Sequence, residues 1–275
     1  MRIGMLMVRH PPTRVSPIMP EVARLLGEWG AKVEVIYPEE HVTSLGSVRV
    51  EHDLYILKSG TELALSLAGV LHTAGAVTLN PYPVAVMLRD KIVTTGKLQE
   101  AGVPVPDTFV TSRPEQLVPL LETGPLVIKP YRGSQGKGVH VVWDAEEIDQ
   151  LTASEGPLFV QRYHEPEGRD RKIYCIGGQL FGVKRIWPPR TYEDKLGAPF
   201  TITPELRRIT MAVGKALGME LFGLDVIMSH GRPYVVDASS FPGFKGVPDA
   251  PLRLADYLYT VAQRVLAGEP PIGIS

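Results

Sequence analysis

Residues 221–240 read LFGLDVIMSHGRPYVVDASS, and two apolar runs in this segment flank a short polar stretch at 229–232. Each run is typical of a β-strand, and the polar stretch with its glycine is typical of a hairpin turn. Asp225 and Asp237 are equally distant from Gly231 in the sequence. An odd-numbered turn centred on Gly231 therefore places the two aspartates opposite each other, with Cβ atoms about 5 Å apart.

Two carboxylates that face each other between apolar strands repel unless a cation lies between them. Ser239 has the same strand parity as Asp237, so its hydroxyl lies on the same face. Oxygen ligands of this kind suit Mg²⁺ or Mn²⁺. We therefore expect Asp225, Asp237 and Ser239 to form a metal site, and Asp225→Asn to stabilise the metal-free protein by relieving the repulsion. An exposed edge hairpin that carries aspartates by chance is the alternative, and the apolar flanks disfavour it.

Two further features precede this hairpin. Lys129 stands in the apolar strand LVIKP at 126–130, where an unpaired ammonium is costly to bury and an anionic ligand would balance it. The glycine-rich sequence YRGSQGKGV at 131–139 follows, and such a loop can present backbone N–H groups to phosphate oxygens. Its spacing does not match a P-loop. A lysine that extends to solvent from the strand end, and a plain hairpin loop, remain open as alternatives.

A basic stretch runs from 162 to 195, with eight Lys or Arg against five Asp or Glu. Strand periodicity places Lys172 and Tyr174 on one face and Arg171 and Ile173 on the other. The stretch is either a solvated surface or a wall that binds phosphate or carboxylate.

The order of predicted elements divides the chain. Strands at 3–8, 33–37, 53–58 and 76–79 alternate with helices, which indicates a parallel sheet. One helix is expected over 82–103. After the rigid connector VPVP, strands adjoin strands in an α+β pattern, and no element is predicted after Ser239.

Composition narrows the function classes. The chain has 275 residues, with 29 Lys and Arg against 30 Asp and Glu, which argues against a chain-wide nucleic-acid or anionic-membrane binder. Its one cysteine allows no internal disulfide, and the apolar run at 62–71 is about half a membrane span. We expect a cytoplasmic protein without a membrane segment.

Taken together and in order, these motifs resemble the ATP-grasp enzymes. The resemblance runs from about residue 89 to 247 through the following motifs: RDK at 89–91, GVPVP at 102–106, LVIKP at 126–130, GSQGKGV at 133–139, FVQRYHE at 159–165, GRDRKIYCIGGQLFGVKRI at 168–186, and the hairpin. It implies an N-terminal parallel α/β subdomain over 1–85, followed by an ATP-grasp domain of two α+β subdomains over 86–275, with a lid at about 104–165.

The resemblance also implies roles for single residues, with ATP and Mg²⁺ (or Mn²⁺) as cofactors. Lys91 and Lys129 would contact the phosphates. The remaining cofactor-binding residues would be Gly133, Ser134, Gln135, Gly136 and Gly138 in the closing loop, Gln161, Arg162, Tyr163 and His164 along the adenine, and Asp170. Asp225, Asp237 and Ser239 would hold the metal, and Lys172, Lys184 and Arg185 would act near the transferred phosphate. Ser239 departs from the family, which has asparagine at that position.

The branch of the family stays open. The glycine-rich loop and the RDK motif are similar to RimK-type ligases, whereas DASSFPGFKGVPD at 237–249 and GGQLFGVKR at 177–185 look more like inositol-phosphate kinases. A carboxylate nucleophile needs no dedicated base and none is evident, so we favour an ATP-dependent carboxylate–amine ligase with an acyl-phosphate intermediate. A kinase acting on a polyol or inositol phosphate is the first alternative, and a non-catalytic ATP-binding module with a weakened metal site is the second. The substrate would be a small molecule or a peptide, and a homo-oligomer is allowed.

Overall fold

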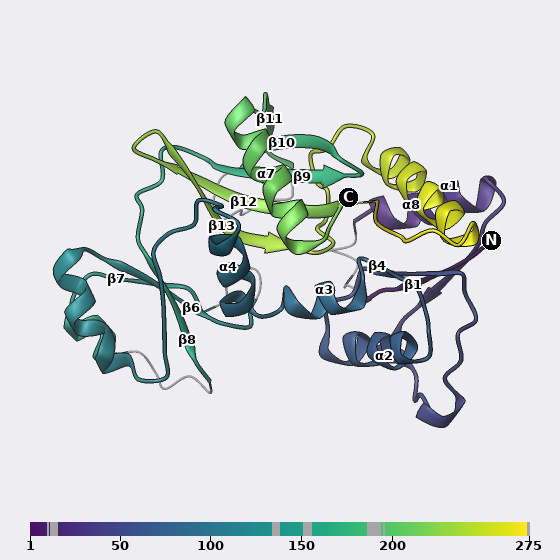
Figure 1. Ribbon diagram of the computed structural model, residues 1–275, viewed down its shortest axis with the longest axis horizontal. Coiled ribbons are helices and arrows are strands. Elements are labelled where there is room, and N and C mark those ends of the chain that lie inside the picture. The colour runs from purple at the N-terminus through teal and green to yellow at the C-terminus, as the bar shows by residue number, and fades with distance from the viewer. Residues whose placement is uncertain are drawn as a thin grey trace.

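The computed structural model describes residues 1–9, 11, 16–133, 138–150, 156–185, 194 and 196–273. Three sheets follow one another across the molecule (Figure 1). Ser134, Gln135 and Gly136, three of the predicted loop residues, lie outside the described residues.

The N-terminal sheet is parallel throughout, as the alternation of strands and helices predicted. Its order is β2 (Lys32–Ile36), β1 (Arg2–Leu6), β3 (Leu54–Leu57) and β4 (Thr78–Leu79). Helices α1 (Ile18–Glu28) and α2 (Glu62–Thr73) connect these strands, with short 3-10 helices η2 (Pro38–Glu40) and η3 (Leu45–Ser47) between β2 and β3. The four strands confirm those predicted from the apolar runs: three are shorter by one or two residues, and β2 has the predicted length but begins one residue earlier.

The sheet at the opposite end of the molecule is antiparallel and small. Its order is β5 (Thr108–Thr111), β8 (Leu158–Arg162), β6 (Leu126–Pro130) and β7 (His140–Val142), with η4 (Pro114–Thr123) and α5 (Ala145–Asp149) packed on it. We call these four strands the lid sheet. Leu126, Ile128 and Val160 form its own hydrophobic core with Leu117 and Ile148 from the two helices.

The central sheet carries the longest strands. Its order is β11 (Ala198–Phe200), β10 (Gln179–Arg185), β9 (Asp170–Ile176), β12 (Leu221–Ser229) and β13 (Arg232–Ser239), all antiparallel. Helix α7 (Pro204–Leu217) covers one face, where Leu206 and Val213 pack against Ile173 and Leu224.

The final helix, α8 (Ala250–Leu266), is an element that we did not predict. Leu254, Leu258 and Val261 recur at helical spacing and are fully buried. They join a core that includes Ile3 of β1 and Tyr174 of β9, so the N-terminal and central sheets share one core. Helices α1 and α8 lie side by side (Figure 1). The division of the chain at residue 85 remains a prediction.

The expected single helix over 82–103 is wrong, because the structure has α3 (Tyr82–Met87) and α4 (Lys91–Glu100) in its place. Asp90 between them is extended, and its carboxylate accepts hydrogen bonds from the backbone N–H groups of Ile92 and Val93. A side chain that caps the second helix in this way ends the first one. The break places Lys91 at a helix start, where its side chain can turn toward the lid sheet.

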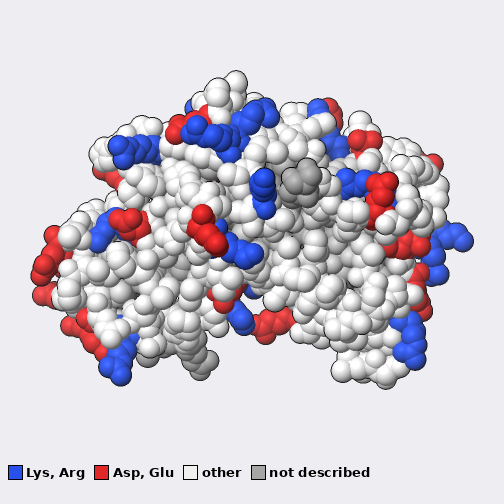
Figure 2. Space-filling view, in the orientation of Figure 1, with Lys and Arg blue, Asp and Glu red and all other residues white. Residues whose placement is uncertain are grey.

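The surface carries charges of both signs. On the face in Figure 2, Lys and Arg lie next to Asp and Glu without an extended area of one sign. Among the helices that the structure describes, none has the length and apolar character needed to cross a bilayer.

Candidate active site

The hairpin of β12 and β13 brings the two aspartates together by a different route from the predicted one. Its turn has two residues, His230 and Gly231, with φ of 48° and 70°, and Ser229 pairs with Arg232. The odd-numbered turn was therefore wrong. Val226 pairs with Val235 and Asp225 with Asp237, so one extra residue on β13 forms a bulge at this point. The bulge restores the opposition of the two carboxylates that the even turn would have removed.

Asp225 is paired with a cation from the neighbouring strand. Lys172 of β9 is its register partner, and the Lys172 Nζ lies 2.7 Å from Asp225 Oδ2. Only 8% of the Lys172 side chain is exposed, so removing the Asp225 charge would leave a buried ammonium without this partner. The expectation that Asp225→Asn stabilises the protein therefore does not hold for this arrangement.

The surroundings of Asp237, the second carboxylate of the pair, disfavour its charged form. Burial, and then repulsion by Asp225, raise its pKa, and the charges of Lys91, Lys172 and Lys129 act in the opposite direction. A divalent cation would relieve the repulsion between the two carboxylates, and the nearby ammonium groups would be balanced by anionic phosphates bound together with it. Among the residues that the structure describes, no group of three His, Cys, Asp or Glu side chains forms a complete metal site. Further ligands would have to come from Ser239, phosphate oxygens or water.

Lys129 connects the lid sheet to the central sheet. Its Nζ donates to Gln161 Oε1 at 2.8 Å within the lid sheet and to the backbone carbonyl of Val236 at 3.4 Å on β13. Burial lowers the pKa of Lys129 to about 8, with Asp237 and Asp225 opposing the shift and Lys91 adding to it. The charges of the aspartate pair therefore act on this ammonium, although its two hydrogen-bond acceptors are an amide and a backbone oxygen. Its predicted contact with the phosphates stays a proposal.

Lys91 and the glycine-rich loop lie against each other. The Lys91 Nζ donates to the carbonyl of Gly133 at 2.7 Å, and its backbone N–H donates to Tyr131 at 3.0 Å. At the other end of the loop, Gly138 has φ of 69°, and a Cβ there would lie 2.9 Å from Pro130. Only glycine fits that close turn over the strand end.

Gln161 is the most buried of the four residues predicted to lie along the adenine. It is 2% exposed, holds Lys129 through its carbonyl oxygen, and donates from Nε2 to Thr108 at 3.3 Å. Its contacts make it a positioning residue for Lys129.

Arg162 has a structural role that the sequence analysis did not anticipate. Its guanidinium donates to the carbonyls of Leu120 at 3.1 Å and Gly124, and to Thr123 Oγ1 at 2.6 Å. These acceptors belong to the end of η4, whose last carbonyls lack partners within the helix. The Arg162 side chain therefore anchors η4 to the lid sheet, and its place along the adenine stays a proposal.

We expect Arg162→Met to destabilise the protein by about 2 kcal/mol, because several charge-assisted hydrogen bonds are lost. Thermal unfolding measures this loss, and the KM for ATP should stay within about threefold of wild type. A strongly raised KM with an unchanged melting temperature would place Arg162 at the nucleotide instead.

The next two residues are held by aromatic contacts. The Tyr163 ring lies 5.5 Å from Trp143, and the His164 ring stacks on Tyr234 at 3.9 Å between centroids. Burial lowers the pKa of His164. The segment after β8 is thus fixed between the lid sheet and the tip of the central hairpin, and its place along the adenine stays a proposal.

The three basic residues predicted near the transferred phosphate do not share one face of the sheet. Val183 pairs with Lys172 and Arg185 with Asp170, so Arg185 is on the face of the aspartates. Lys184 pairs with Arg171 on the opposite face, with its Nζ 6.0 Å from the Phe200 ring centroid. Alternation along β10 therefore removes Lys184 from the candidate site.

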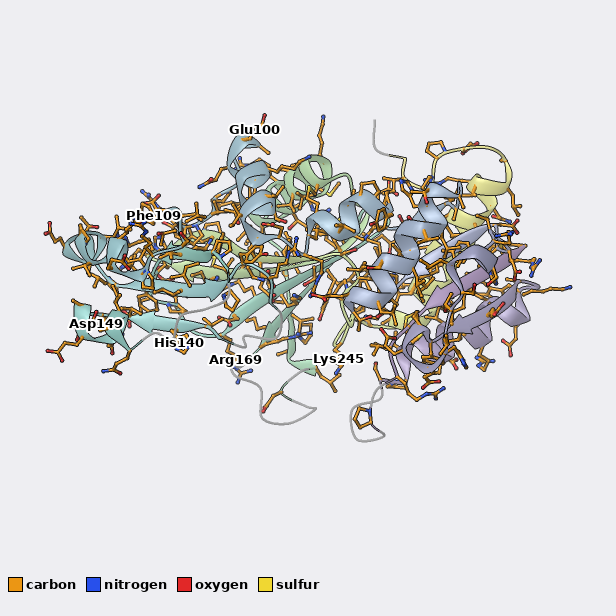
Figure 3. All side chains as sticks on the ribbon, turned by 90° about the horizontal axis from the view of Figure 1, so that it is seen from below. Glu100, Phe109, His140, Asp149, Arg169 and Lys245 are labelled. Atoms are coloured by element: carbon orange, nitrogen blue, oxygen red, sulfur yellow. The ribbon has the colours of Figure 1, made fainter. Side chains whose placement is uncertain are left out.

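Arg185 and Asp170 lie at the same end of this face. Arg185 donates to the Tyr174 hydroxyl and, at 3.2 Å, to the Lys245 carbonyl, and its buried Nε has no partner in the described chain. Burial, and then Asp225, raise the pKa of Asp170. Figure 3 shows Arg169 and Lys245 on the same side of the molecule as His140 of the lid sheet, opposite Glu100.

A cavity of about 180 Å³ opens beside Asp237. Its lining includes Lys91, Gly133, Asp237 and Ser239, which had been predicted as site residues, and also Lys58 and Arg89, which had no predicted role. Lys58 ends an apolar strand in the same way as Lys129 does, so the same signal was present in the sequence at 54–58.

The fold and this arrangement of lysines, aspartates and glycine-rich loop define an ATP-grasp architecture. The model of the RimK-like ATP-grasp domain matches residues 88–256, and the chain belongs to that family.

Three comparisons illustrate the similarity. A protein of Methanococcoides burtonii named "Probable alpha-L-glutamate ligase" is 27% identical over 216 residues, 72% of this chain and 71% of that protein. A protein of the same name from Legionella pneumophila (strain Corby) is 28% identical over 195 residues, 66% of this chain and 64% of that protein. The crystal structure of an ATP-grasp RimK domain protein from Sphaerobacter thermophilus matches with a TM-score of 0.74 at 18% identity, over 94% of this chain and 99% of that one.

Proposed function

We propose that the protein is an ATP-dependent carboxylate–amine ligase that releases ADP and forms an amide or peptide bond. The observation that carries the proposal is the contact between Lys129 on the lid sheet and β13 beside Asp225 and Asp237. A nucleotide's phosphates between these two sheets would meet ammonium groups from one side and a metal held by carboxylates from the other. The family and the two relatives named as glutamate ligases support an amino-acid substrate, for which L-glutamate is the first candidate.

The residues fit a divalent cation. Asp225 and Asp237 are cross-strand partners, and the pKa of Asp237 is raised by burial and then by repulsion from Asp225, which a cation would relieve. We propose that these carboxylates hold Mg²⁺, with the Ser239 hydroxyl at the rim. When bound, the metal neutralises charge on the transferred phosphoryl group. Mn²⁺ would suit the same oxygen ligands.

Each side chain of the site has a separate role in the proposed reaction. Lys91 and Lys129 bind and orient the phosphates, and Gln161 keeps the Lys129 ammonium in place. The substrate carboxylate attacks the γ-phosphorus and ADP leaves, which gives an acyl phosphate. The amine then attacks the acyl carbon and inorganic phosphate leaves. Lys172 and Arg185, on the same face as the aspartates, would stabilise negative charge on the acyl oxygen.

The acyl phosphate provides the test. Purified protein with ATP, Mg²⁺, L-glutamate and hydroxylamine should release ADP and form a hydroxamate, because hydroxylamine intercepts an activated carboxylate. Asp237→Asn is the matched control and should form at least about 100-fold less. A phosphate ester that survives hydroxylamine, made from a polyol or inositol phosphate, would establish the kinase alternative instead.

We also propose that the enzyme acts in the cytoplasm. The one cysteine, Cys175, is buried and free, and its pKa is raised to about 11 by burial, so it is an unreactive thiol that needs no oxidising compartment.

A further inference from the structure

The cavity beside Asp237 has a second wall that the proposed chemistry does not use. This wall comes from the segment after β3 and from the junction of α3 and α4, and it carries Lys58, Ser59, Gly60 and Arg89. The cavity of about 180 Å³ has room for on the order of ten water-sized groups. It is therefore large enough to hold part of a small substrate between this wall and the aspartates.

Lys58 reaches from the N-terminal sheet to the segment after β13. Its Nζ donates to the carbonyl of Phe241 at 2.9 Å and lies 5.2 Å from the Phe241 ring centroid. Burial, and then the charge of Lys245, lower its pKa to about 8. An ammonium has three protons to donate, and this contact uses one.

Arg89 lies close to the segment that follows β3. Its Nη1 would lie 3.8 Å from a Cβ on Gly60, so the guanidinium lies over the segment at 58–60. Within the described parts of the chain, neither Arg89 nor Lys58 forms an ion pair with an acidic residue. Two partly buried cations beside one cavity, neither of them in an ion pair with a described carboxylate, favour an anionic ligand.

We propose that Lys58 and Arg89 form a carboxylate-binding site, and that the carboxylate they hold belongs to the substrate but is not the one that becomes phosphorylated. The inference rests on the ligase function, because the reacting carboxylate must lie at the phosphates, where Lys91 and Asp237 line the same cavity. A carboxylate at Lys58 and Arg89 is therefore a second one. The planar guanidinium suits it, since its donors match the two carboxylate oxygens.

Direct binding measurements test the proposed carboxylate-binding site without turnover. Calorimetric titration of protein saturated with Mg²⁺ and a non-hydrolysable ATP analogue should show glutarate and L-glutamate binding at least about tenfold more tightly than acetate and L-glutamine. Lys58→Met and Arg89→Met should each lose this preference, with a 10- to 100-fold weaker affinity for L-glutamate. Lys97→Met, which removes an exposed lysine of α4, should retain it.

The variant Lys58→Gln tests whether the loss of binding in Lys58→Met comes from misfolding. Its amide retains an N–H donor near the Phe241 carbonyl but carries no charge, so the variant should keep or raise the melting temperature and lose the preference for dicarboxylates. Equal affinities for L-glutamate and L-glutamine in wild type, or a full preference in Lys58→Gln, would overturn the proposal.

The hydroxylamine reaction shows whether the carboxylate at Lys58 and Arg89 belongs to the acyl donor or to the incoming amino acid. If it is the remote carboxylate of the acyl donor, Lys58→Gln raises the KM for L-glutamate in hydroxamate formation by 10- to 100-fold. If it is the carboxylate of the incoming amino acid, wild type forms no hydroxamate from L-glutamate alone, while the binding difference persists. A binding preference lost in Lys58→Gln, without hydroxamate or ADP from any amino acid tested, would keep the anion site and reject the ligase function.

Discussion

Lys129→Met should lower kcat/KM for ATP by about 10²- to 10³-fold, because the variant removes the ammonium that we propose to bind the transferred phosphate beside Asp237. The same change should leave the melting temperature of the ligand-free protein unchanged or raise it. The pKa of Lys129 is about 8 in the folded protein, below that of an exposed lysine, so at neutral pH its charge opposes folding. Steady-state ADP release and thermal unfolding measure the two effects.

The pH dependence follows from the same pKa. In wild type, the KM for ATP should rise as the pH increases above about 8, because the free enzyme then loses the ammonium before ATP binds. The contribution of Lys129 to stability has the opposite sign: it is unfavourable below about pH 8 and vanishes as the pH rises past the ordinary lysine value. Lys97→Met should match wild type in both measurements, and a Lys129→Met variant that retains wild-type kcat/KM would exclude this lysine from the site.

Asp237→Asn should lower the rate of Mg²⁺-dependent turnover about 10³-fold. The same variant should stabilise the ligand-free protein. Burial and Asp225 raise the pKa of Asp237 in the folded state, so the charged carboxylate destabilises the fold once the pH exceeds its ordinary value. The stability gain should be largest at neutral pH and disappear in acid, where Asp237 is protonated in both states. Melting temperatures between pH 4 and 8, with and without Mg²⁺ and ATP analogue, give the comparison.

Asp225→Asn provides the comparison for Asp237→Asn. It removes the same formal charge one strand away, but it should destabilise the ligand-free protein by about 2 kcal/mol, because Lys172 loses its ion pair in a buried position. Stability changes of the same sign in both variants would contradict the assignment of Lys172 to Asp225.

Local chemistry in the sequence was sufficient to locate most strands. The runs at 3–8, 33–37 and 221–228 are apolar over a strand's length, and burial of that pattern requires a sheet whatever the rest of the chain does. Helix α8 was missed although Leu254, Leu258 and Val261 have helical spacing, because its partner α1 lies more than 200 residues earlier in the sequence.

The sequence indicated which charged residues could belong to the candidate site, but not where each of their side chains points. Lys129 and the aspartate pair were found because a charge within an apolar strand needs a partner. The contacts of Arg162 could not be predicted, because its acceptors at the end of η4 are distant in the sequence. Lys184 and Arg185 are consecutive residues of β10, so strand alternation already places them on opposite faces, and the structure decides which of the two faces the aspartates.

The sequence alone determined the class of the protein, because the order of its lysines, glycines and aspartates along the chain is independent of how strands pair. The tertiary structure decided which of these residues meet. A bulge of one residue on β13 opposes Asp225 to Asp237, Lys172 reaches Asp225 from a strand 53 residues away, and Lys58 and Arg89 enter the same cavity from the N-terminal sheet and the α3–α4 junction. The physical reason is that strand register and side-chain direction depend on long-range packing, which a local pattern of residues does not specify.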